Sequence, residues 1–151
     1  MQQHFHWQGL APSTRGTSVA MGNFDGVHRG HQAVIDLARG PAPLGIITFE
    51  PHPRQFFAPA APAFRLMNAE ARANRLARLG VQHLFQLPFD ATLARLTPEA
   101  FVTEVLHEGL GIAHVVVGAD FCFGKGRAGK AQDLATLCET RGIRTTIAPL
   151  V

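Results

Sequence analysis

The 151-residue sequence has only two cysteines and no long apolar run, and each shortage excludes a class of protein. Cys122 and Cys138 lie sixteen residues apart, which fits neither a zinc-ligand spacing nor a disulfide framework. We therefore expect reduced thiols and a cytoplasmic protein. No stretch approaches the roughly 18 apolar residues of a membrane span, and the N-terminus has no basic segment followed by an apolar run. We expect neither a membrane partner nor a signal peptide.

The net charge is also small, because 14 Lys and Arg residues and 11 Asp and Glu residues leave a formal net charge of +3. The basic residues are scattered, apart from a cluster at Lys125, Arg127 and Lys130. Proteins that bind nucleic acid usually carry a broader basic stripe, so we expect no nucleic-acid partner. One local cluster suits a small anionic ligand better. The length and the 46% of hydrophobic residues predict one globular domain over 1–151.

Strand-like and helix-like stretches alternate along the chain. Short apolar runs predict five strands, at 17–21, 44–49, 83–87, 115–117 and 143–148. Amphipathic stretches between them predict four helices, over 30–39, 68–79, 97–109 and 132–141. This alternation predicts an α/β fold, a Rossmann-like doubly wound parallel sheet of about five strands with helices on both faces. Ligands of such sheets bind beyond the carboxyl ends of the strands, where three segments of unusual composition fall: 22–31, 50–57 and 118–130.

The segment 22–31 reads Gly-Asn-Phe-Asp-Gly-Val-His-Arg-Gly-His and joins the first predicted strand to the first helix. Its glycines permit turns that other residues resist, and a helix N-terminus offers N–H groups and a positive dipole end to phosphate. His28 and His31 are three residues apart, so both could donate to one phosphate chain. The alternatives are a capping histidine beside a surface one, and a His-x-x-His metal site supported by Asp25.

This string resembles the His-x-Gly-His signature of the nucleotidyltransferase superfamily. The resemblance implies that His28 and His31 are catalytic, contacting the ATP phosphates and stabilising the transition state as pyrophosphate leaves. It implies an ATP site formed by Gly22, Asn23, Phe24, Asp25, His28, Gly30 and His31. We assign no metal-ligating residue.

The other two segments resemble motifs of bacterial FAD synthetases. Residues 48–54, Thr-Phe-Glu-Pro-His-Pro-Arg, are similar to a Thr-Phe-Glu-Pro-His-Pro stretch, and 118–127 to a Gly-Glu-Asp/Asn-Phe-x-Phe-Gly-x-Gly-Arg loop. From the residues alone, Phe121 and Phe123 could flank a planar ring or anchor the loop to the core, and Lys125 with Arg127 could meet phosphates. The resemblance implies a flavin site formed by Pro51, His52, Pro53, Arg54, Asp120, Phe121, Phe123, Gly124, Lys125 and Arg127.

Residues 124–130 also fit the P-loop spacing G-x-x-x-x-G-K. The next residue, Ala131, has no hydroxyl for Mg²⁺, and the preceding predicted strand ends several residues too early. We therefore expect no P-loop here.

Three separated motifs in this order make the chain, from about Val19 to Val151, similar to the N-terminal FMN adenylyltransferase domain of the bacterial bifunctional riboflavin kinase/FAD synthetase family. The resemblance implies adenylyl transfer from ATP, with Mg²⁺, to FMN, giving FAD and pyrophosphate. The family's Ser-Ser-Thr-x-x-Arg motif and its riboflavin kinase domain are absent from these 151 residues. We therefore expect a domain truncated at its C-terminus. The alternatives are a fragment that binds nucleotide or flavin without turnover, and a nucleotidyltransferase for another phosphate substrate.

Overall fold

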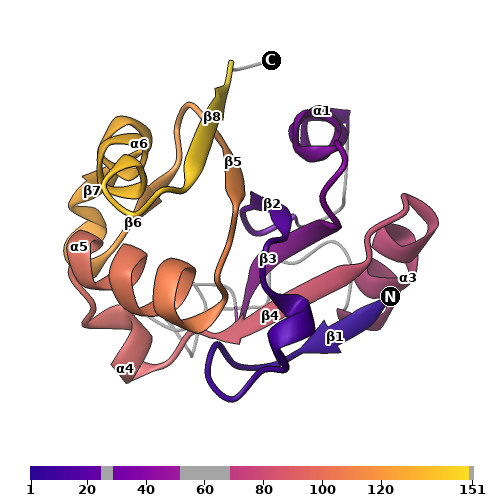
Figure 1. Ribbon diagram of the computed structural model, residues 1–151, viewed down its shortest axis with the longest axis horizontal. Helices are drawn as coiled ribbons and strands as arrows, with labels where there is room; N and C mark the ends of the chain where they lie inside the picture. Colours follow the sequence, from indigo (N-terminus) through magenta and orange to yellow (C-terminus); the bar gives the residue numbers. More distant parts are fainter. Residues whose placement is uncertain (25–28, 52–68, 150–151) are drawn as a thin grey trace, which may run out of the picture.

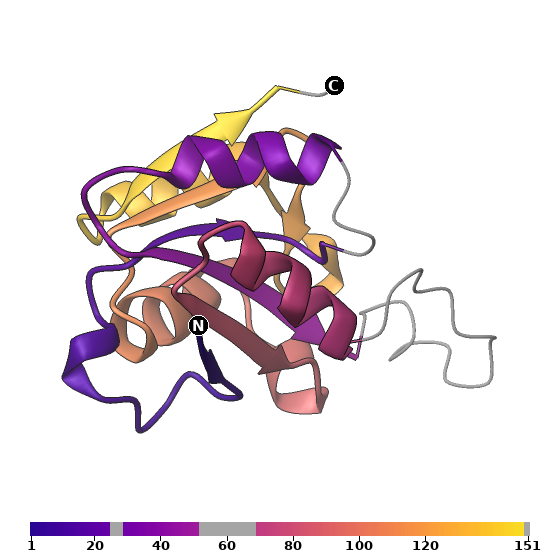
Figure 2. The ribbon, with the colours of Figure 1, turned by 90° about the vertical axis from the view of Figure 1, so that its right-hand side faces the viewer.

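A six-stranded, fully parallel sheet forms the centre of the computed structural model, which describes residues 1–24, 29–51 and 69–149 (Figures 1 and 2). In spatial order its strands are β1 (Gln2–His4), β4 (His83–Pro88), β3 (Leu44–Glu50), β2 (Ser18–Met21), β5 (His114–Gly118) and β8 (Arg144–Ala148). The predicted α/β class and parallel doubly wound sheet are confirmed. All five predicted strands are present, within two residues of their expected bounds.

Helices cover both faces of this sheet, as Figure 1 shows. The helices α1 (Arg29–Ala38) and α3 (Ala69–Arg78) lie on one face, and η2 (Phe101–Gly109) and α6 (Ala131–Glu139) lie on the other. The strand register explains the two cores. Ala20 pairs with Ile46 and Val116, and all three face α1 and α3, whereas the alternate residues of each strand face η2 and α6. Strands covered on both faces need continuous apolar runs, which made them recognisable in the sequence.

The sixth strand, β1, is missing from the sequence prediction. It is three residues long, polar, and lies at the sheet edge beside β4, so it carries no apolar pattern. Also unpredicted are the short helices η1 (Pro12–Thr14) and α4 (Ala91–Ala94) and a two-stranded hairpin of β6 (Cys122–Phe123) and β7 (Gly129–Lys130). These short elements depend on tertiary contacts more than on periodicity.

The predicted helix over 97–109 is present but is not a regular α-helix. The Thr97 hydroxyl accepts a hydrogen bond from the Ala100 N–H at 3.1 Å, and Pro98 occupies the first turn of α5 (Pro98–Ala100). The chain then continues as the π-helix η2, which the Leu110 N–H closes by donating to the Val105 carbonyl at 2.8 Å.

The strand order reverses beside β2. After β2, the next two strands along the chain, β3 and β4, lie in order on one side of β2. The later strands β5 and β8 lie on its other side. The carboxyl ends of β2, β3 and β5 are therefore neighbours, and the three unusual segments start at one edge of the sheet. Within the described part of the chain, no helix is both long and apolar enough to cross a bilayer.

Candidate functional site

The first part of the candidate site is the β2–α1 loop, of which the structure describes residues 22–24. The Gly22 N–H donates to the Ile47 carbonyl of β3 at 3.0 Å, which extends the strand pairing by one residue. The Asn23 carbonyl accepts a hydrogen bond from the Thr48 hydroxyl at 3.1 Å. Phe24 then adopts a left-handed backbone conformation, with φ of 49°, and its ring is buried. The extended backbone of β2 therefore does not continue through Phe24.

His31 lies in the first turn of α1, next to Gly30. Its imidazole is half-buried and meets the Phe24 ring edge-on, with ring centroids 5.1 Å apart and an interplanar angle of 62°. This contact fixes the histidine at the N-terminal end of α1, where backbone N–H groups and the helix dipole favour an anion. Asp25 and His28 were predicted for the same site and lie outside the described residues.

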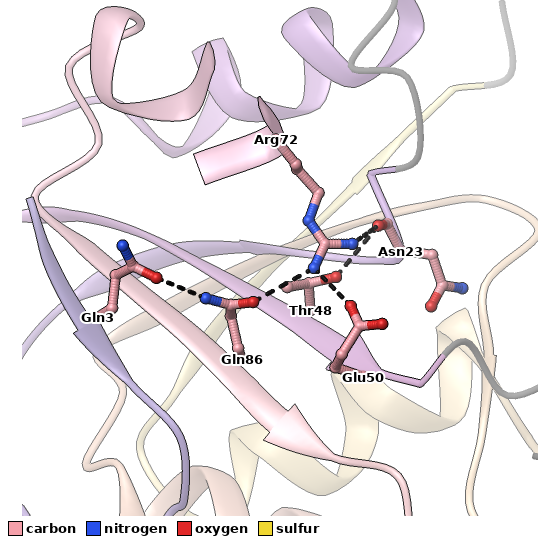
Figure 3. A network of polar contacts seen from close by, with 6 residues as sticks. All are labelled: Gln3, Asn23, Thr48, Glu50, Arg72 and Gln86. Atoms are coloured by element: carbon pink, nitrogen blue, oxygen red, sulfur yellow. Dashed lines mark hydrogen bonds and ion pairs between the residues drawn. The ribbon is translucent and has the colours of Figure 1, made fainter. Parts of the chain in front are cut away.

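The second segment begins where β3 ends. Glu50 forms an ion pair of 2.9 Å with the buried Arg72 of α3 (Figure 3). Pro51, the next residue, is exposed. The predicted residues His52, Pro53 and Arg54 lie outside the described residues. Sequence patterns gave no reason to connect Glu50 with Arg72, because the two residues stand on a strand and on a helix 22 residues apart.

A small cavity of about 80 Å³, here called the phenylalanine cavity, lies at the same edge of the sheet. It brings together one residue of the β2–α1 loop, the ends of β3 and β4, and the loop after β5. Its lining consists of Asn23, Phe49, Phe89, Leu93, Phe101, Phe121, Cys122, Phe123 and Gly124. Five of these, Phe49, Phe89, Leu93, Phe101 and Cys122, were not predicted as site residues. Phe49 and Phe89 stand at strand ends, a position that could have indicated a role at this edge.

The rings of Phe121 and Phe123 stack on each other, with centroids 6.0 Å apart and an interplanar angle of 19°. Inserting a planar ligand between two rings requires about 7–8 Å, twice the ordinary contact distance, so no ring fits between them. Phe123 is buried and packs against Phe101 at 5.7 Å, which makes it an anchor of the loop. Phe121 is partly exposed at the cavity wall.

The basic residues of the third segment lie on a short exposed turn, η3 (Lys125–Arg127). Gly124 precedes it with φ of 79°, and a Cβ there would lie 2.8 Å from the Pro98 nitrogen, so only glycine fits. Asp120 is exposed in the tight turn before β6. The residues from Gly124 to Lys130, which fit the P-loop spacing in the sequence, form this turn and strand β7 of the hairpin.

A larger hollow, of about 560 Å³, lies elsewhere, along β8 and α6. His114, the first residue of β5, lines this hollow at the amino-terminal edge of the sheet. The Ser18 hydroxyl donates its hydrogen to the Ala38 carbonyl at 2.7 Å, and it therefore accepts a hydrogen bond from His114 Nδ1 at 3.0 Å. His114 Nε2 then accepts from the Thr146 hydroxyl at 2.8 Å. Burial, with Arg144 nearby, lowers the pKa of His114, which is therefore a neutral link between strands. We place the candidate site at the carboxyl edge, since ligands of such sheets bind there.

Among residues 1–24, 29–51 and 69–149, no group of three or more His, Cys, Asp or Glu side chains is placed to hold a metal ion.

A family model described as FAD synthetase matches residues 10–151. The bifunctional riboflavin kinase/FMN adenylyltransferase of Pseudomonas fluorescens is 42% identical over 125 residues, covering 80% of this chain and 40% of that protein. The FAD synthetase of Listeria monocytogenes is 36% identical over 149 residues, covering 94% of this chain and 60% of that protein. The chain thus spans about half the length of these relatives.

Two solved structures share the fold. The crystal structure of a macrolide-efflux protein from Streptococcus pneumoniae superposes with a TM-score of 0.79 at 24% identity, covering 99% of this chain and 51% of that chain. Pantothenate synthetase from Thermus thermophilus superposes with a TM-score of 0.65 at 17% identity, covering 100% of this chain and 62% of that chain. At these identities the similarity concerns the fold alone.

Proposed function

The chain belongs to the FAD synthetase family, and from this premise we propose that it transfers the adenylyl group of ATP to FMN, giving FAD and pyrophosphate. The printed names of the two relatives, FMN adenylyltransferase and FAD synthetase, support this activity. The proposal covers adenylyl transfer only, since the chain spans part of its relatives.

In the proposed step, a phosphate oxygen of FMN attacks the α-phosphorus of ATP. A new oxygen–phosphorus bond forms, the bond from the α-phosphorus to the α,β-bridging oxygen breaks, and pyrophosphate leaves with that oxygen. A phosphate monoester is largely ionised near pH 7, so its oxygen needs no protein base. Mg²⁺ enters with ATP, as a complex in which phosphate oxygens and water supply most ligands. The contribution of the protein is positioning and electrostatic stabilisation.

The ATP phosphates are proposed to lie at the N-terminal end of α1. The N–H groups of its first turn and the imidazole of His31 would donate to them, and Gly30 would allow close approach. Gly22, Asn23 and Phe24 would form the wall of this subsite. The motif assigns His28 and Asp25 to the same place.

The flavin is proposed to enter the phenylalanine cavity. Ligand pockets usually measure about 300–1,000 Å³, so the cavity of about 80 Å³ has to open, and the partly exposed Phe121 is the side chain most able to move. Lys125 and Arg127 follow the cavity residues Phe123 and Gly124 directly in the sequence and would attract the FMN phosphate. The motif adds Pro51, His52, Pro53, Arg54 and Asp120 to this subsite.

One observation carries this proposal: Asn23, in the β2–α1 loop, also lines the phenylalanine cavity. The two proposed subsites therefore share a border. Adenylyl transfer requires this adjacency, because the FMN phosphate has to reach the α-phosphorus of ATP in line with the leaving group.

The test is FAD formation from FMN and MgATP, with pyrophosphate release followed in parallel. Replacing His31 by Ala is expected to lower kcat by about 10²–10³-fold, the usual effect of losing one donor to developing charge. The matched control is His6→Ala, which removes an exposed histidine outside the site. A folded wild-type chain that binds FMN and ATP but makes no FAD would indicate a binding fragment. Pyrophosphate release with a different phosphate acceptor, and none with FMN, would indicate another substrate.

A further inference from the structure

Arg72 is the one arginine of α3 that faces the sheet. Its side chain is 1% exposed and lies on the same helix face as the buried Ala73 and Leu76, whereas Arg75 and Arg78 on the same helix are exposed. Burying a guanidinium is unfavourable unless hydrogen bonds and an opposite charge replace its water. Its partners therefore explain its position.

Those partners come from the β2–α1 loop and from the neighbouring strands β3 and β4, as Figure 3 shows. Arg72 Nη1 donates to the Asn23 carbonyl at 3.3 Å, and Nη2 donates to Glu50 Oε2 at 2.9 Å. Nη2 also lies 3.5 Å from Gln86 Oε1 on β4, and Gln86 Nε2 in turn donates to Gln3 Oε1 on β1 at 2.7 Å. The planar fork of an arginine can reach several acceptors at once, which a lysine cannot reproduce.

Two of these acceptors lie near the start of the predicted ligand-binding segments 22–31 and 50–57. Asn23 is in the β2–α1 loop, directly before the left-handed Phe24, and Glu50 is the last residue of β3, directly before Pro51. The Asn23 carbonyl is held from two sides, by the Thr48 hydroxyl and by Arg72. Because a peptide group is planar, fixing this carbonyl also fixes the direction in which the chain enters Phe24.

We propose that Arg72 is a positioning residue for adenylyl transfer, an inference that rests on the function proposed above. By binding the Asn23 carbonyl and the Glu50 carboxylate together, Arg72 sets the spacing between Asn23, after β2, and Glu50, at the end of β3. Arg72 does not line the phenylalanine cavity, so it acts through these two residues and not on the flavin.

This role predicts which kinetic constant changes. In-line attack requires the FMN phosphate and the α-phosphorus to be aligned, and a displacement of about 1 Å can lower a rate by about 10²-fold. Loss of Arg72 is therefore expected to lower kcat and weaken ATP binding. FMN affinity is expected to change less, because Asn23 is the one residue of the cavity lining to which Arg72 is hydrogen-bonded. A purely structural role would lower the melting temperature and weaken both ligands alike.

The test compares Arg72→Met, Arg72→Lys and the matched control Arg75→Met in the full chain. Met replaces the unbranched part of the arginine side chain without its charge, and Glu50, with a side chain 40% exposed, can be hydrated when its partner is lost. Measurements are steady-state FAD formation, FMN affinity by flavin fluorescence, and affinity for a non-hydrolysable ATP analogue by calorimetry. We expect Arg72→Met to lower kcat about 100-fold with FMN affinity within about threefold, Arg72→Lys to lower kcat about tenfold, and Arg75→Met to stay within about twofold.

Wild-type kcat in a folded Arg72→Met variant would overturn the inference, as would equal weakening of FMN and the ATP analogue. If Arg72→Met does not fold, Glu50→Gln replaces it, because it weakens the ion pair and keeps the bond from Arg72 to Asn23; an unchanged kcat in that variant would also overturn the inference. If the wild-type chain makes no FAD, the proposed function fails on its own. The inference about Arg72 is then tested with the ATP analogue. Affinity for the analogue that is about tenfold or more weaker in Arg72→Met, and not in Arg75→Met, supports the inference. Equal affinity in Arg72→Met and the wild type, or no binding by the wild type, overturns it.

Discussion

At the scale of single residues, the two cysteines show how surroundings decide reactivity. Both are unpaired, but Cys138 is buried between α6 and the sheet, and this burial raises the pKa of its thiol to about 11. Cys122 is partly exposed at the wall of the phenylalanine cavity, with Lys130 Nζ 3.5 Å from its sulfur. Only the thiolate reacts with thiol reagents, so the two cysteines are expected to differ strongly.

At pH 8 we expect one fast-reacting thiol in the native protein and two after unfolding, measured with a chromogenic disulfide reagent. A thiol with a pKa of about 11 is ionised to only about one part in a thousand at pH 8, so Cys138 is not expected to react in the fast phase. FMN is expected to slow the fast reaction, because Cys122 lines the proposed flavin cavity. The variant Cys122→Ser serves as control and should abolish the fast phase. A fast phase that FMN does not slow would argue against flavin in this cavity.

At the scale of elements, two histidines contact each other between the edge strand β1 and its neighbour β4. His4 on β1 and His83 on β4 stack at 5.3 Å, His4 also stacks on Phe85 at 5.0 Å, and His4 Nε2 lies 3.1 Å from His83 Nδ1. Such a hydrogen bond needs at least one neutral ring. Burial lowers the pKa of both histidines. The His83 charge lowers that of His4 further, and the N-terminal ammonium lowers that of His83.

These shifts predict acid sensitivity of the β1–β4 edge. Because the folded pKa values lie below the ordinary 6.5, the unfolded chain binds more protons as the pH falls from 6.5, so stability is full above that pH and decreases below it. The midpoint of urea unfolding should therefore be lower at pH 5.5 than at pH 8. His4→Phe keeps a ring on Phe85 and removes one titrating group, so its decrease should be smaller. His114 also has a lowered pKa, but it contributes equally in both proteins. An identical decrease in the two would exclude the histidine pair as the cause.

At the scale of the whole molecule, the proposed site draws on both halves of the sheet. The β2–α1 loop and the ends of β3 and β4 come from one half, and the loop after β5 comes from the other. A ligand bound between them contacts segments that come together only in the folded chain. Binding should therefore stabilise the entire fold and not one segment.

FMN at about 100 times its dissociation constant is expected to stabilise the chain by about 2.7 kcal/mol. For a domain of this size, that corresponds to a melting temperature about 5–11 °C higher. Thermal unfolding followed by circular dichroism measures it, with inorganic phosphate at the same concentration as the control. A melting temperature that FMN leaves unchanged would contradict the flavin proposal.

Local sequence signals were sufficient to predict most of the secondary structure of this protein and the edge of the sheet where the candidate site lies. The apolar runs of the strands, the Thr97 cap with Pro98, and the alternation of strands with helices were readable because each depends on residues close together in the chain. The position of the candidate site at the strand ends followed from that alternation. His31 was singled out by its spacing from His28 in a glycine-rich segment, and Gly124 by the resemblance of 118–127 to the FAD synthetase motif.

Only the tertiary structure decided which side chains complete the site. Arg72, Arg75 and Arg78 recur at a spacing of three, and nothing local distinguishes the one that turns inward. That choice depends on acceptors at Asn23 and Glu50, 49 and 22 residues away. The convergence of Phe49, Phe89 and Phe101, and the pairing of His4 with His83 across 79 residues, are of the same kind. Burial and pairing between distant segments depend on which elements become neighbours, and a local pattern does not contain that information.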